Sequence, residues 1–352
     1  MIRRVIAKFG NARWLHNGFA IALFLGAAGC DRAPAMIELS GPAQGTTYSV
    51  KIAAPPVSID SHAVRLVIDD VLQKVDLQMS GYRPDSEISR FNQSASTDWF
   101  DVSPEFAAVI ALSRQVSEQS QGALDVTVAP LVNLWGMGTT GELRQVPADA
   151  DLERVRNRIG YEKLSLRPRP PALRKAVPDL SIDLNAVAPG YTVDLLAARF
   201  LALGIENYMI DLGGEVRAHG RNAQGQPWRI AVERPVNTEP EPYAIVQLEN
   251  MAVTTSGEYR HFVDRDGHRY SHTIDPRTLR PVEHTLASVV VVSRTAAEAD
   301  AWATALNVLG AEKGYALALQ QGMPVMFIID NAGKLESRMT PQFQNYIAVA
   351  PQ

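Results

Sequence analysis

An aspartate and a threonine stand four residues apart in the run Ala299-Asp300-Ala-Trp-Ala-Thr304, within a segment of helical periodicity. This spacing places a carboxylate and a hydroxyl on one face of a helix. Such oxygen ligands suit a hard cation such as Mg²⁺, which takes few protein ligands and leaves the rest to water and substrate phosphate. The spacing alone nevertheless favours a simpler interpretation, in which the helix dipole stabilises the aspartate and the threonine bonds back to a carbonyl.

A second candidate site is the run from Ser181 to Tyr191, which we predict to lead from a short strand into a helix. The free N–H groups of a helix N-terminus attract phosphate. Asp183 lies just before it, where a carboxylate could accept a hydrogen bond from a base or ring N–H. The run matches neither a Walker A motif nor G-x-G-x-x-G, so it gives no support for dinucleotide binding of those types. An ordinary strand-to-helix turn explains it equally well.

A third segment is rich in histidine. His268 and His272 have the i, i+4 spacing of a helical zinc site, but Pro276 and the neighbouring Tyr270 and Thr273 argue against a helix, and the motif H-E-x-x-H is absent. We therefore interpret His272 as a general base beside Asp275. Solvated surface positions are the favoured interpretation for the other three histidines of the segment, His261, His268 and His284.

A fourth segment, from Met79 to Asn92, is a polar loop after a predicted helix and carries Tyr82. The tyrosine ring could stack on a flat ligand or anchor the loop.

Helices and strands must position these residues, and the sequence predicts where both lie. Apolar residues at helical spacing, N-cap residues and closing glycines predict five helices, over Ser61–Met79, Ser103–Gly122, Asp149–Ile159, Pro189–Leu203 and Thr295–Leu309. Strand-like runs are Tyr48–Ala53, Tyr208–Leu212, Trp228–Glu233, Tyr243–Leu248, Ala287–Ser293 and Met323–Ile329. Two proline-rich stretches, Arg167–Pro178 and Val236–Pro242, are predicted to be exposed loops.

The strands cluster after residue 205 and are often separated by turn residues rather than by helices. This order predicts an α+β fold with a mixed, largely antiparallel sheet flanked by helices. No flexible interdomain linker is evident, so we expect a single catalytic unit, which could have two lobes.

The N-terminus has the pattern of a secretory leader. Residues 1–29 carry four basic and no acidic residues, and a short apolar run ends at Cys30. The run is shorter than the roughly 20 residues of a spanning helix. A core helix with a buried cysteine fits this pattern less well. Ala27-Ala28-Gly29-Cys30 resembles a bacterial lipobox, which implies cleavage before Cys30 and its lipidation, and Asp31 resembles a signal for retention at the inner membrane.

We therefore divide the chain into a signal peptide over 1–29, the lipidated Cys30 and a spacer over 30–40, and a catalytic domain over 41–352. The expected location is the periplasmic face of the bacterial inner membrane, with a lipid anchor.

The composition narrows the class of protein. The chain has 352 residues, 34 Lys and Arg against 38 Asp and Glu, and one cysteine. This length suffices for a large core. The near balance of charge argues against a nucleic-acid partner, and a single cysteine excludes an intrachain disulfide scaffold. Loss of the leader would change the formal charge from −4 to −8.

Eight motifs in their order along the chain resemble those of the ApbE family, from about Gly41 to about Gly310. They are Gln44–Tyr48, Met79–Asn92, Gly122–Gly136, Asp183–Asp194, Leu212–Glu215, Thr255–Arg260, His272–Pro276 and Ala299–Thr304. Members of this family are FAD:protein FMN transferases, and in many bacteria they are periplasmic lipoproteins.

The resemblance implies two groups of site residues. FAD would contact Gln44, Tyr82, Ala123, Leu124, Asp125, Asp183, Pro189 and Ile274. Mg²⁺ would be held by the backbone carbonyl of Ala186 and by Asp300 and Thr304, with Ala303 nearby. This reverses the preference for a simple helical role of Asp300 and Thr304.

The implied reaction moves FMN from FAD to a Thr or Ser hydroxyl of a partner flavoprotein and releases AMP. Mg²⁺ would neutralise charge on the leaving AMP, and His272 with Asp275 would accept the proton of the attacking hydroxyl. Acceptors of relatives are subunits of respiratory sodium pumps and similar membrane flavoproteins. Two rival functions are an Mg²⁺-dependent FAD pyrophosphatase that releases FMN and AMP, and a non-catalytic flavin-binding lipoprotein.

The chain departs from the family pattern at three positions. Gln44 replaces a usual Met, Pro189 stands where Lys is frequent, and Leu279 replaces the Gly of Asp-Pro-x-Thr-Gly. Pro189 has no side chain that could contact phosphate, so FAD affinity is expected to be weaker than in relatives.

Overall fold

We describe the protein from a computed structural model, which places residues 36–138, 146–235, 241–257, 262–265 and 268–350. The predicted leader, Cys30 and His261 lie outside the described residues, as does the side chain of His268.

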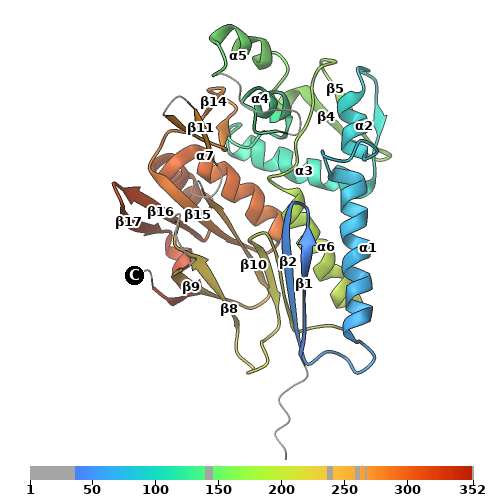
Figure 1. Ribbon diagram of the computed structural model, residues 1–352, viewed down its shortest axis with the longest axis vertical. Helices are drawn as coiled ribbons and strands as arrows, with labels where there is room; N and C mark the ends of the chain where they lie inside the picture. The colour runs from blue at the N-terminus through green and yellow to red at the C-terminus, as the bar shows by residue number, and fades with distance from the viewer. Residues whose placement is uncertain (1–35, 139–145, 236–240, 258–261, 266–267, 351–352) are drawn as a thin grey trace, which may run out of the picture. The chain divides into compact units, whose positions relative to one another are not determined.

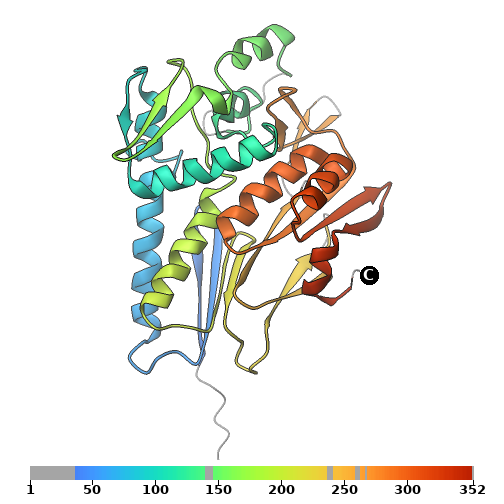
Figure 2. The ribbon, with the colours of Figure 1, turned by 180° about the vertical axis from the view of Figure 1, so that it is seen from behind.

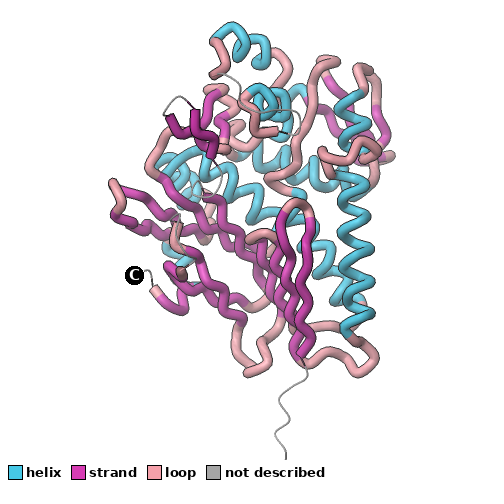
Figure 3. The backbone as a smooth tube through the Cα atoms, viewed as in Figure 1, coloured by secondary structure: helices cyan, strands magenta, loops and turns pink. Residues whose placement is uncertain are grey.

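An eight-stranded sheet forms the centre of the fold (Figures 1 and 3). Every adjacent pair in it is antiparallel. In spatial order its strands are β1 (Met36–Ala43), β2 (Thr46–Ala53), β6 (Tyr208–Leu212), β7 (Glu215–His219), β10 (Met251–Gly257), β15 (Leu286–Ser293), β16 (Val325–Asn331) and β17 (Lys334–Met339). The predicted α+β class is confirmed, and this sheet is wholly antiparallel rather than mixed.

Three long helices cover one face of this sheet, as the view from behind shows (Figure 2). They are α1 (Ser61–Met79), α6 (Ala188–Ala202) and α7 (Ala296–Gln320), and α3 (Pro104–Gln119) packs against α7. Their buried side chains and the inner face of the sheet form one apolar core. On the opposite face lies a small sheet of β8 (Trp228–Glu233), β9 (Pro242–Leu248) and β18 (Ile347–Val349), with its own core.

The five predicted helices are confirmed, and three of them, α1, α3 and α7, begin at a residue whose side chain caps the helix. Asp60 accepts a hydrogen bond from the Ala63 N–H at 2.8 Å at the start of α1. Thr295 does the same for the Glu298 N–H at 3.3 Å at the start of α7. Gly310 has φ 75° and ψ 175°, so the first half of α7 does end there as predicted. A further helical stretch runs on to Gln320, which the sequence analysis missed.

Smaller elements surround the upper part of the helices in Figure 1. The short helices are α2 (Glu87–Gln93), α4 (Ala129–Leu134) and α5 (Asp149–Arg156); the short strands are β3 (Phe100–Asp101), β4 (Leu164–Pro168), β5 (Pro171–Lys175), β11 (Phe262–Arg265), β12 (His268–Ser271), β13 (Ile274–Asp275) and β14 (Arg280–Pro281). The prediction of an exposed loop over Arg167–Pro178 is wrong, because β4 and β5 form a hairpin here in which Ala172 and Leu173 are buried. The prediction for Val236–Pro242 falls largely outside the described residues.

Candidate functional site

Three adjoining cavities are lined by residues of α4, α7 and β10 and of the segment 181–186 that precedes α6. The loop cavity, of about 460 Å³, lies under the segment that carries Tyr82. The inner cavity, of about 240 Å³, is lined by Ala123–Asp125 and Ile274. The groove, of about 840 Å³, extends along β8 and β10. Asn185 lines all three, so we treat them as one site.

Asp300 is held in place by the contact between the N-termini of α6 and α7. Its carboxylate accepts a hydrogen bond from the Gly190 N–H at 3.2 Å and is buried. A Cβ at Gly190 would lie 2.4 Å from the Ala296 carbonyl oxygen, so only glycine allows this approach. Asp194 fixes the contact further, because its two carboxylate oxygens accept hydrogen bonds at 2.9 Å from the N–H groups of Ala296 and Ala297.

The carboxyl groups around Asp300 repel one another in a buried setting. Burial raises the pKa of Asp300 to about 7, the charge of Asp194 adds to the rise, and the Gly190 N–H opposes it. Burial also raises the pKa of Glu215, and the charge of Asp300 raises it further. A bound cation would relieve both effects.

The donor atoms at this point fit a hard cation. Thr304 lines both the inner cavity and the groove, Asp300 lines the groove and Ala186 lines the inner cavity. A carboxylate, a hydroxyl and a backbone carbonyl are the oxygen donors that Mg²⁺ accepts. Among the described residues, no three His, Cys, Asp or Glu side chains are arranged to hold a metal by themselves. A cation here would therefore depend on backbone and hydroxyl oxygens as well.

The raised pKa of Asp300 predicts how stability changes with pH in the absence of metal. Between about pH 4 and pH 7 the folded protein keeps a proton that the unfolded chain releases, so its free energy of unfolding should fall by a few kcal/mol as the pH rises. Asp300→Asn should make this slope shallower in urea unfolding measured with EDTA at pH 5 and pH 7.5. An unchanged slope would contradict the assignment.

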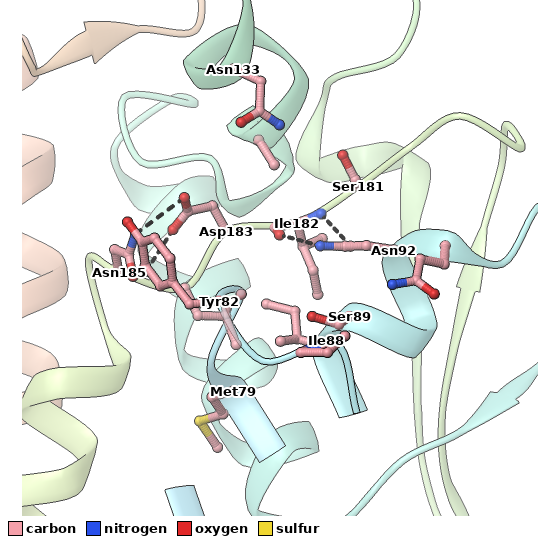
Figure 4. A pocket seen from close by; sticks show the side chains of 15 residues that line it. Met79, Tyr82, Ile88, Ser89, Asn92, Asn133, Ser181, Ile182, Asp183 and Asn185 are labelled. Atoms are coloured by element: carbon pink, nitrogen blue, oxygen red, sulfur yellow. Dashed lines mark hydrogen bonds between the residues drawn. The ribbon is translucent and has the colours of Figure 1, made fainter. Parts of the chain in front are cut away.

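The segment of Asp183 is held by side chains from far along the chain (Figure 4). The amide group of Asn92 pairs with both backbone groups of Ile182, donating to its carbonyl and accepting from its N–H at 2.8 Å each. The Asp183 N–H donates to the Val126 carbonyl at 2.7 Å. The Asp183 carboxylate accepts from the Asn185 N–H at 2.7 Å, and burial raises its pKa. Asp183 thereby lines both the loop cavity and the inner cavity.

Asp125 lines the inner cavity, but its carboxylate serves the loop itself. It accepts hydrogen bonds from the N–H and hydroxyl of Thr127 at 2.8 and 2.6 Å and from the Tyr161 N–H at 2.9 Å. A ligand in the inner cavity would therefore contact this loop mainly at Ala123 and Leu124.

His272 stands at the junction of the inner cavity and the groove, which it lines together with Thr304 and Ser256. Asp275 lines a different cavity, of about 320 Å³. Both oxygens of its carboxylate accept hydrogen bonds from the guanidinium of Arg277, at 2.8 and 2.7 Å. That Asp275 assists His272 as a base stays a prediction. The hydrogen bonds to Arg277 do not favour this role.

Comparison with known proteins identifies the family. The profile of the ApbE family matches residues 44–327. The chain belongs to the ApbE family. It is 40% identical over 329 residues to the FAD:protein FMN transferase of Vibrio cholerae, covering 94% of this chain and 98% of that one. Relatives of this kind make the protein an enzyme of the transferase class.

Solved structures agree. The fold superimposes on the flavin transferase ApbE of Vibrio cholerae with a TM-score of 0.82 at 40% identity, covering 89% of this chain and 99% of that one. The apo form of the Pseudomonas stutzeri flavinyl transferase ApbE gives 0.82 at 36% identity, covering 90% and 98%.

Four of the residues that the ApbE resemblance assigns to the site differ from the others in where they lie. Tyr82 lines the loop cavity and the groove with 72% of its surface exposed. Gln44, Pro189 and Ala303 are absent from the described linings of the three cavities. The Gln44 amide instead donates to the Thr192 hydroxyl at 3.0 Å, and Ala303 is fully buried in α7.

Leu279 stands where the ApbE resemblance implies a glycine, and its backbone conformation suits one. Its φ is 64°, a left-handed conformation that glycine adopts without strain. Its side chain is buried beside Trp135, and its carbonyl accepts a hydrogen bond from the Trp135 indole N–H at 3.0 Å. Apolar burial offsets the backbone strain in this member of the family.

The sequence analysis missed Asn92, Asn185 and Glu215 as site residues. Asn92 and Glu215 each end a recognised motif, which was the available signal.

No helix in the described part of the chain is long and apolar enough to cross a bilayer.

Proposed function

We propose that this protein transfers FMN from FAD to a Thr or Ser hydroxyl of a partner flavoprotein and releases AMP, with Mg²⁺ as cofactor. The observation that carries the proposal is that Asp300, Thr304 and His272 line the same groove, and that Thr304 and His272 also line the inner cavity beside it. Membership of the ApbE family supports it, because curated relatives are named FAD:protein FMN transferase.

The residues of the chain have separate tasks in this reaction. Asp300, Thr304 and the Ala186 carbonyl would hold Mg²⁺, which would supply positive charge to the pyrophosphate when bound. Ala123, Leu124 and Ile274 bind FAD in the inner cavity, and Asp183 offers a carboxylate to an N–H group of the same ligand.

His272 moves the proton. The acceptor hydroxyl oxygen attacks the phosphorus on the FMN side, and the bond from this phosphorus to the bridging oxygen breaks. AMP leaves with that oxygen, and the hydroxyl proton passes to the imidazole. The position of His272 between the two cavities lets it face FAD on one side and the acceptor on the other.

One assay separates transfer from its alternatives. The protein is mixed with FAD, Mg²⁺ and the flavin-carrying subunit of a respiratory sodium pump made without its FMN, and the subunit is weighed by mass spectrometry. We expect the mass to rise by one FMN less one water, with AMP released. Free FMN and AMP without labelled subunit would indicate an FAD pyrophosphatase, and unchanged FAD would indicate a flavin-binding protein; either result would contradict transfer.

We also propose that Cys30 carries a lipid anchor at the periplasmic face of the inner membrane, on the support of the lipobox-like run that precedes it. Replacing Cys30 by alanine should move the protein from the membrane fraction to the soluble fraction without changing FMN transfer in solution. The measurement is cell fractionation followed by the mass assay. Retention of the variant in the membrane fraction would contradict lipidation at this residue.

A further inference from the structure

The groove follows the edges of two strands. Four consecutive residues of β8, Ile230–Glu233, line it, and so do five of β10, Val253–Gly257. Successive side chains of a strand point to opposite faces, so lining by consecutive residues means that the groove runs along the strand edge rather than over one face.

Among the described residues, no strand pairs with the outer edge of β8 over Trp228–Val232, or with β10 beyond Thr254 on its β7 side. β8 pairs with β9 on one side and is the outer strand of its sheet. The pairing of β10 with β7 ends at Thr254, opposite Glu215, whereas its pairing with β15 continues to Gly257. A strand edge of this kind presents backbone N–H and C=O groups to another chain.

The groove also differs from the rest of the site in what it can bind. Of the residues predicted to contact FAD, only Tyr82 is among the described residues that line it, whereas most of the others line the inner cavity. His272 and Thr304 line both. FAD and its metal would therefore reach into the groove only at the end where Asp300, Thr304 and Tyr82 lie, and a molecule along β8 would meet FAD there, beside His272.

Small residues leave room in the groove for a second backbone. Ala231 on β8 is exposed, and Gly213 and Gly214 line the groove at the β6–β7 turn. An extended segment fits such a space better than a helix, whose diameter with side chains is about 10–12 Å.

We propose that the acceptor flavoprotein docks here through an extended segment, which adds as a strand to the outer edge of β8 over Trp228–Val232 and directs its Thr or Ser hydroxyl toward His272. The proposal rests on the proposed FMN transfer. Main-chain hydrogen bonds supply binding in this mode, and side-chain contacts along the groove supply selectivity.

The first test fills the groove. Ala231→Trp should reduce kcat/KM for the acceptor subunit by at least about tenfold, mainly through KM, while the Kd for FAD and the midpoint of thermal unfolding stay unchanged. The matched control is Gln247→Trp, an exposed position on β9 opposite Arg229 that is not part of the groove lining. The control should transfer FMN like the wild type.

The second test detects the strand itself. Hydrogen exchange is measured by mass spectrometry on the FAD-loaded protein, with a pump subunit whose acceptor Thr is replaced by Val so that it binds without reaction. We expect slower exchange of the amides of Trp228–Glu233. If the wild type labels the normal subunit, but β8 exchange is unchanged and Ala231→Trp transfers normally, the docking proposal is overturned and FMN transfer stands. If the wild type labels no subunit, FMN transfer itself fails, and the docking proposal with it.

Discussion

Replacing Asp300 by asparagine should lower the rate of FMN transfer by about 10³-fold. Asparagine keeps the shape of the side chain and can still accept the Gly190 hydrogen bond, but it removes the negative charge that would hold Mg²⁺. A metal ion contributes several kcal/mol of charge stabilisation in phosphoryl chemistry, and each 1.4 kcal/mol is worth about a factor of ten. The rate is followed as labelled acceptor against time.

The matched control for Asp300→Asn is Glu312→Gln, which removes a carboxylate from the same helix at an exposed position, where it pairs with Arg338. This control should transfer FMN at the wild-type rate. Equal rates for wild type, Asp300→Asn and Glu312→Gln would remove Asp300 from the reaction. A binding measurement adds a second readout, because Asp300→Asn should weaken Mg²⁺ binding in calorimetry while the fold stays intact.

Replacing His272 by alanine should reduce transfer by about 10²–10⁴-fold and leave FAD binding unchanged, since general-base catalysis is worth about this much. His272 is one of many residues that line the inner cavity, so its replacement leaves most of the expected FAD contacts in place. The pH dependence of kcat/KM distinguishes a base from a structural role, because loss of a base should change the shape of the profile, whereas a structural loss should lower the rate equally at every pH.

The control for His272→Ala is His62→Ala, at an exposed position near the start of α1 that is absent from the described cavity linings. Full transfer activity in His272→Ala would exclude His272 as the base. Loss of FAD binding in this variant would instead give His272 a role in binding. A parallel variant, Asp275→Asn, removes the ion pair with Arg277. If this ion pair only stabilises its loop, the variant should transfer FMN more slowly because the protein is less stable, and the shape of its pH profile should not change.

The sequence predicts the regular elements well where local signals act alone. Thr295 and Glu298 mark the start of α7, and Gly310 marks its break, because capping and positive φ are decided within a few residues. The sequence analysis did not predict β10. Three polar residues that line the groove, Thr254, Thr255 and Ser256, interrupt the alternation of apolar and polar residues by which a strand is recognised.

The site depends on contacts that no local pattern contains. Asn92 and Ile182 are 90 positions apart, and Gly190 and Asp300 are 110 positions apart. The motifs placed these residues near a site through their resemblance to a family, but the pairing of Asn92 with a backbone segment follows only from the fold. The same holds for Asp275, whose nearness to His272 in sequence suggested a dyad, whereas its carboxylate pairs with Arg277.

The most direct test of the account is the metal dependence of covalent FMN transfer. The purified protein, FAD and the sodium-pump subunit are incubated with Mg²⁺, with excess EDTA, and with EDTA followed by excess Mg²⁺, and the subunit is weighed in each case. We predict one FMN per subunit with Mg²⁺, none with EDTA, and full labelling after Mg²⁺ is restored. Complete labelling in EDTA would contradict the role given to Asp300 and Thr304, and with it the central claim.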